Sequence, residues 1–135
     1  MTMRYLAAVA VLSSVAIHLT LWFQGMRSVH VIGHAFLANV AGGLVIAVLL
    51  VRWRHAGAGV LAACFGASTL GAFTLASTIG LFGDHEKWAG FSVFAAATVE
   101  IVAIVAGLAI MLEDPEPAPV LARVQSVGAN RSDRA

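Results

Sequence analysis

The sequence predicts an all-α protein, a four-helix transmembrane bundle, and three observations support this fold class. Hydrophobic residues make up 60% of the 135-residue chain and charged residues only 11%, whereas soluble domains average about 25% charged residues. Four long apolar runs account for most of the chain. Each run has 20 or more residues, enough for a helix to cross about 30 Å of hydrocarbon. This composition excludes a disordered chain, a basic nucleic-acid-binding protein and an ordinary soluble enzyme.

The positions of the charges define the runs. Seven of the fifteen charged residues follow Leu112, seven others lie at the ends of the runs or between them, and only Glu100 lies inside a run. We therefore predict one transmembrane domain over residues 1–112.

The first run, residues 5–24, begins after Arg4. A charged start followed by an apolar stretch is also typical of a secretory signal peptide. Here, however, the apolar stretch continues through Trp22 and Phe23, past any small-residue cleavage pattern. We therefore interpret the run as a transmembrane helix that is retained in the protein.

The second run, residues 31–51, and the third, residues 57–82, are separated by only five residues. Connections this short make consecutive helices antiparallel neighbours. The third run also carries small residues at helical spacing, which predicts a close-packing face; these residues are Ala63, Ala67, Gly71, Thr74 and Thr78.

The fourth run, residues 90–112, ends shortly before Pro115, the first of three closely spaced prolines. Proline lacks the amide N–H and disfavours a helical conformation in the residue before it. Residues 113–135 are polar or small, and we predict that they form a disordered cytoplasmic tail.

The distribution of basic residues predicts the orientation of the bundle. Four spans place both termini on one side, which carries six arginines, while the other side carries only Arg27 and Lys87. Because basic residues concentrate in cytoplasmic segments, both termini are expected in the cytoplasm. Trp53 and Trp22 then lie at the inner and outer interfaces, as an aromatic belt requires.

Polar side chains inside the runs are concentrated in the outer half and middle of the predicted bundle. At about 1.5 Å of rise per residue, His18 and His34 lie below the outer surface, and Asn39 and Glu100 lie near mid-membrane. The inner half is nearly all apolar, which disfavours a continuous pore. We predict an outward-facing pocket formed by His18, His34, Asn39 and Glu100. The mid-membrane layer also contains three hydroxyl side chains, Ser14, Ser68 and Thr69.

Glu100 leaves two interpretations open, because an ionisable group in a bilayer is costly and calls for a stated role. It is either a proton-coupled or cation-binding carboxylate, or a neutral carboxyl group that makes a structural hydrogen bond or anchors a partner subunit.

The histidines leave cofactor binding open. His30 and His34 are four residues apart, and His18 or His85 would add a third nitrogen ligand for a transition metal. Alternatively, His18 and His34 would ligate a haem iron from two neighbouring helices. No paired-cysteine, HExxH or CxxCH motif is present. A third interpretation makes these histidines hydrogen-bonded packing residues.

Three segments, residues 18–22, 31–39 and 80–83, carry a resemblance to known proteins. Together with the spans between Arg4 and Leu112, they resemble small four-helix integral membrane proteins of high-GC bacteria that have no assigned activity. The resemblance implies a multi-pass protein of the bacterial plasma membrane. It implies no catalytic residue.

We therefore expect a small non-enzymatic membrane protein, an accessory or scaffold subunit with an outward-facing polar pocket. Its expected partners are membrane lipid and either further copies in a homo-oligomer or a larger membrane complex, and not nucleic acid. Two other classes stay open: a haem- or metal-binding redox component that uses the histidines, and a small solute or ion transporter centred on Glu100.

Overall fold

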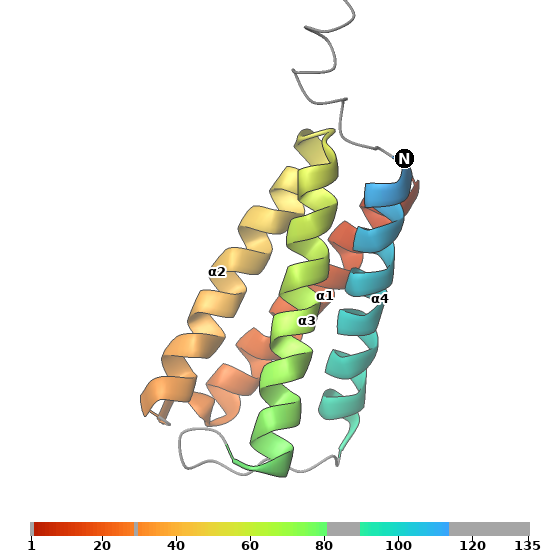
Figure 1. The fold of residues 1–135 in the computed structure, drawn as a ribbon. Coiled ribbons are helices and arrows are strands. Elements are labelled where there is room, and N and C mark those ends of the chain that lie inside the picture. The colour runs from red at the N-terminus through yellow and green to blue at the C-terminus, as the bar shows by residue number, and fades with distance from the viewer. Residues whose placement is uncertain (1, 29, 81–89, 114–135) are drawn as a thin grey trace, which may run out of the picture.

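The computed structural model describes residues 2–28, 30–80 and 90–113. Within these residues the secondary structure is entirely helical (Figure 1). Four helices of 23 residues each, together with the short 3₁₀ helix η1 (Met26–Ser28), make up the fold: α1 (Thr2–Gln24), α2 (His30–Arg52), α3 (Ala56–Thr78) and α4 (Phe91–Glu113).

All four long helices are long and apolar enough to cross a membrane. This confirms the predicted all-helical class and the presence of four candidate spans. Of the predicted tail, residues 113–135, Glu113 belongs to α4 and residues 114–135 lie outside the described residues, as does the loop that contains His85.

The helix bounds differ from the predicted runs chiefly at the end of α3. The third run extends to residue 82, whereas α3 ends at Thr78. The backbone N–H of Ile79 donates to the carbonyl of Leu75 at 3.1 Å, and Gly80 adopts a φ of 81°. Because glycine enters this left-handed region without steric cost, it ends the helix inside the apolar run.

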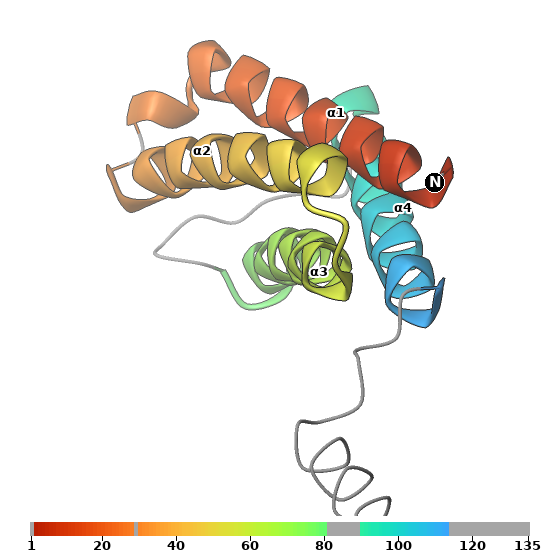
Figure 2. The same cartoon turned by 90° about the horizontal axis from the view of Figure 1, so that it is seen from above.

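Helix α4 packs against both α1 and α3, and α1 packs against α2 (Figure 2). In contrast, α2 and α3 contact each other much less than these pairs do, although they are consecutive in the chain. The space between α2 and α3 is therefore not closed by direct helix packing.

Helices α3 and α4 approach each other closely at glycines. A Cβ atom on Gly59 would lie 2.6 Å from the carbonyl oxygen of Gly107, and one on Gly66 would lie 2.6 Å from the carbonyl oxygen of Glu100. These distances are too short for any side chain, so the two backbones meet only because glycine occupies these positions.

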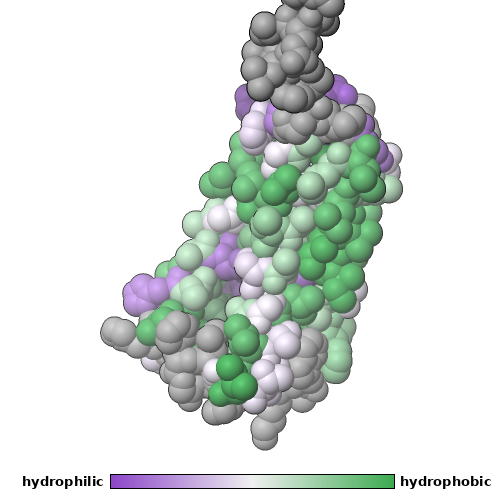
Figure 3. All heavy atoms as spheres, viewed as in Figure 1, coloured by the Kyte–Doolittle hydropathy of each residue, from purple (hydrophilic) through white to green (hydrophobic). Residues whose placement is uncertain are grey.

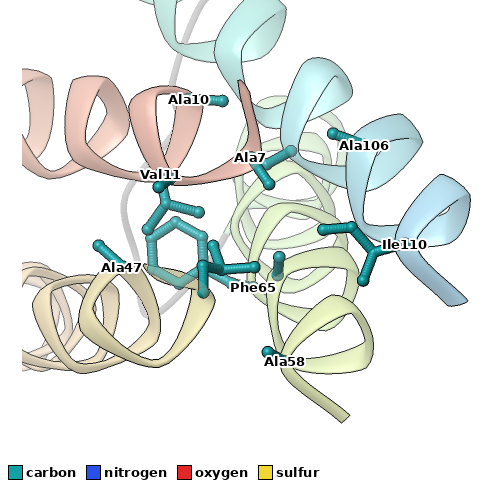
Figure 4. Close-up of a cluster of buried hydrophobic side chains, with 12 residues drawn as sticks. Ala7, Ala10, Val11, Ala47, Ala58, Phe65, Ala106 and Ile110 are labelled. Atoms are coloured by element: carbon teal, nitrogen blue, oxygen red, sulfur yellow. The ribbon is translucent and has the colours of Figure 1, made fainter. Parts of the chain in front are cut away.

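The packing face of α3 thus agrees only in part with the predicted one. Ala63, from the predicted face, lies against Gly107 of α4, as does Gly59, whereas Ala67, Gly71 and Thr74 are exposed. Helix α3 carries small residues on several faces, so spacing alone could not identify the buried one. The interior is built from alanines and a few larger side chains, among them Val11, Phe65 and Ile110 (Figure 4).

Arg4 connects the beginning of α1 to the segment that joins α2 to α3. Its guanidinium donates to the carbonyl oxygens of Trp53 at 2.9 Å and of His55 at 3.2 Å. Carbonyl groups at the C-terminal end of a helix carry a partial negative charge, so a cation stabilises this end of α2. The imidazole Nδ1 of His55 accepts from the backbone N–H of Gly57 at 3.1 Å and caps the start of α3.

Candidate functional site

A pocket of about 420 Å³ lies among the four helices, in the half of the bundle away from Arg4 and the α2–α3 connection. Its walls come from the end of α1, the first half of α2, the second half of α3 and the first half of α4. Most lining side chains are apolar, and five polar ones are present: His18, Asn39, Ser68, Thr69 and Glu100. A small-molecule site commonly combines such apolar walls with a few placed polar groups, in volumes of roughly 300–1,000 Å³.

His18 is held in one orientation by its own helix. Its Nδ1 lies 2.8 Å from the carbonyl oxygen of Ser14, one turn earlier in α1, and 3.2 Å from the Ser14 hydroxyl. A carbonyl oxygen can only accept, so this contact places the ring proton on Nδ1. In the neutral ring, Nε2 is then a hydrogen-bond acceptor. The ring also contacts Phe36 of α2, with 5.1 Å between ring centroids.

Glu100 lies near the middle of α4 and is 2% exposed. Its Oε1 faces Nε2 of His18 at 3.9 Å. This distance satisfies an ion pair and is too long for a hydrogen bond. Among the residues that the structure describes, the Glu100 carboxyl group makes no hydrogen bond, so it and Nε2 leave hydrogen-bonding capacity on either side of a short gap.

Asn39 of α2 supplies a third polar group. Its Oδ1 accepts from the hydroxyl of Thr69 in α3 at 3.2 Å, and the same hydroxyl lies 2.9 Å from the carbonyl oxygen of Phe65. The amide Nδ2 is buried and has no hydrogen-bond partner in the part of the chain that is described. A buried amide donor without a partner is costly in apolar surroundings.

Phe65 packs on the side of this polar layer that faces the α2–α3 connection. It is 7% exposed, and a Cβ atom on Gly43 would lie 3.1 Å from its ring and would also collide with Val15. The ring of Phe65 thus occupies the space that Gly43 leaves open. Val11 and Ala47 point towards the same ring (Figure 4).

The pocket opens sideways between α2 and α3. The lining side chains of Ala35 and Ala38 on α2 and of Ser68 and Ala72 on α3 are exposed. The surface over these helices is largely hydrophobic and is interrupted by hydrophilic residues (Figure 3). In a membrane this opening faces the bilayer.

The structure brings together three of the four residues predicted to form the pocket. His18, Asn39 and Glu100 come from three helices and line the same cavity. His34 is exposed on α2 and is not among the lining residues.

Cofactor binding can be compared with the structure only in part. His85 and the side chain of His30 lie outside the described residues. Within the described part of the chain, no three His, Cys, Asp or Glu side chains gather as a metal site. Of the proposed haem ligands, His18 lines the pocket described above and His34 does not.

Sequence reasoning missed the aromatic residues of the site. Phe36, which contacts His18, and Phe65, whose carbonyl oxygen lies 2.9 Å from the hydroxyl groups of Ser68 and Thr69, are both apolar residues in apolar runs. Phe36 lies three residues before Asn39, a spacing that places both on one helix face. This spacing is the only sequence signal for either residue.

In comparisons with known proteins, no family model, no curated protein and no solved structure matches this chain.

Proposed function

We propose that this chain is a non-enzymatic accessory protein of a membrane, whose role is to bind a small amphiphilic molecule. The observation that supports this proposal is the pocket of about 420 Å³ in which His18, Asn39 and Glu100 converge from three helices. In a protein that binds no ligand, a buried polar group without a hydrogen-bond partner only destabilises the fold.

The opening between α2 and α3 supports binding from the bilayer. The exposed lining residues Ala35, Ala38 and Ala72 have small apolar side chains, which leave a path that a lipid-soluble molecule can use. The polar groups lie deeper, at the level of Glu100. A ligand with an apolar body and a polar head satisfies both parts of the site.

We also propose that consecutive helices are antiparallel, that both termini are cytoplasmic, and that the protein resides in a bacterial plasma membrane. The excess of arginine on the side of the termini supports this orientation. The outward-facing apolar side chains would contact lipid or a second membrane protein, including further copies of the chain.

Equilibrium binding tests the proposed function. The protein in lipid nanodiscs is titrated with three tritiated probes that share one apolar cage: 1-adamantanol, 1-fluoroadamantane and 1-adamantanamine. At least one probe should bind saturably, with one site per chain. Ala38→Phe should abolish saturable binding because its ring fills the opening of the pocket.

Ala41→Phe is the matched control. Ala41 lies on the same helix and is also exposed, but it does not line the pocket. This variant should bind like the wild type. The proposal is wrong if none of the three probes binds saturably to the wild type, or if the two variants behave alike.

A further inference from the structure

We propose that the pocket selects a membrane-dissolved alcohol or phenol, a molecule whose apolar body carries a hydroxyl group. This inference rests on the proposed binding function and specifies the chemistry of its ligand. It follows from the hydrogen-bonding capacity that three side chains leave unused: one acceptor on His18 and donors on Asn39 and Glu100.

The acceptor is fixed by local geometry. The carbonyl oxygen of Ser14 lies 2.8 Å from Nδ1 of His18 and holds the ring proton there. Nε2 of the neutral ring therefore presents a lone pair towards Glu100 and the pocket. A ligand that donates one hydrogen bond satisfies it.

One donor is the Nδ2 amide of Asn39, which is buried without a partner among the described residues. The other is the carboxyl group of Glu100. A charge at this depth is costly, so the neutral forms of Glu100 and His18 are the less costly pair. A neutral carboxyl group donates one hydrogen bond through its O–H.

A hydroxyl group is the simplest head that matches this pattern, because its oxygen both donates and accepts. Oε1 of Glu100 and Nε2 of His18 are 3.9 Å apart. An oxygen atom at about 2.8 Å from each of them completes a hydrogen-bond bridge across the gap. The hydroxyl donates to Nε2 and accepts from the carboxyl group.

Other polar heads fit less well. A carbonyl oxygen cannot donate, so it leaves Nε2 of His18 without a partner. An ammonium group cannot accept, so it leaves the O–H of the neutral Glu100 carboxyl group without a partner. An anionic head finds no Lys or Arg among the described lining residues. A head that both donates and accepts satisfies His18 and Glu100 together.

The apolar part of the ligand then occupies the apolar part of the pocket, which is lined by Phe36, Phe73 and several alanines. Its opening between α2 and α3 lets a longer body extend into the bilayer.

The experiment compares 1-adamantanol with 1-fluoroadamantane, in which fluorine of similar size replaces the hydroxyl and cannot donate. The wild type in nanodiscs should prefer the alcohol by about tenfold, as expected for a hydrogen-bonded hydroxyl. In His18→Leu this preference should fall to about threefold or less, because the acceptor is lost. Because the preference is a ratio of two affinities measured in the same variant, a general change in the affinity of the pocket cancels from it.

Two further variants separate a hydroxyl site from a cation site. Glu100→Gln keeps a donor, in its amide, and should retain the preference for the alcohol. Thr98→Val, on the same helix but exposed and outside the pocket, is the control and should match the wild type.

An unchanged preference in His18→Leu would overturn the inference. The inference would also be overturned if 1-adamantanamine bound to the wild type more tightly than the alcohol and this advantage disappeared in Glu100→Gln. That result would identify a cation site. If probes bind and Ala38→Phe blocks them but the alcohol has no advantage, the hydroxyl inference is wrong and the binding function stands. If no probe binds saturably, the binding function itself fails.

Discussion

Asn39 illustrates at the scale of one residue how a binding site conflicts with stability. Its Nδ2 lacks a partner in the described structure, whereas its Oδ1 accepts from Thr69. Replacing a buried polar side chain that lacks a hydrogen-bond partner with an apolar one changes the free energy of unfolding little or raises it. Removing only the partner of such a side chain lowers the free energy of unfolding.

Asn39→Leu should therefore leave the free energy of unfolding unchanged or raise it by up to about 1 kcal/mol. The measurement is unfolding in mixed micelles titrated with sodium dodecyl sulfate. Thr69→Val is the contrasting variant. It leaves both polar atoms of Asn39 unpaired and should lower the free energy by about 1–2 kcal/mol. A loss of more than about 2 kcal/mol in Asn39→Leu would mean that the amide is a structural group.

Arg4 has the opposite character, because its charge is used for stability. It is 9% exposed, and its guanidinium bonds two carbonyl oxygens at the α2–α3 connection. Arg4→Ala should lower the free energy of unfolding by about 2 kcal/mol, and Arg4→Lys should lower it less. Arg52→Ala, at an exposed position on the end of α2, is the control and should change it by less than about 0.5 kcal/mol. Equal losses in the Arg4→Ala and Arg52→Ala variants would show that the connection does not depend on Arg4.

Among the elements, α3 and α4 form a close pair, and their contact depends on the absence of side chains. Gly59→Ala would place a methyl group 2.6 Å from the carbonyl oxygen of Gly107. The helices must then separate, and the free energy of unfolding should fall by about 1–3 kcal/mol. Gly71→Ala is the matched control on the same helix, because a Cβ atom there meets nothing within 4 Å. It should be neutral or stabilising, since alanine favours the helix over glycine. The same loss in both variants would contradict a packing role for Gly59.

The elements also show where sequence reasoning stops. A spacing of three and four residues correctly indicates helical faces, but α3 has small residues on more than one face. Which face is buried depends on how closely the partner backbone approaches, and Gly107 on α4 decides that. Gly80 similarly lies inside an apolar run, and only its φ of 81° identifies it as the residue that ends α3.

For the whole molecule, the arginine distribution makes a prediction about topology. Green fluorescent protein fused after Ala135 should fluoresce, because it folds in the cytoplasm. Alkaline phosphatase inserted after Ser28 should be active, because it folds outside. The reverse pattern would place both termini outside and would contradict the proposed orientation.

The sequence by itself determined the helical class and the four candidate spans, because these depend on the order of apolar and charged residues along the chain. It also singled out the polar residues of mid-membrane depth, since depth follows from position in a helix. Whether those residues meet was decided only by the tertiary structure. The side chains of His18, Asn39 and Glu100 line one cavity, whereas that of His34 is exposed. The rotation of each helix decides this, and it depends, like the weak packing of α2 on α3, on contacts between distant parts of the chain. Those contacts rest on glycines and alanines, whose role depends on the backbone that faces them.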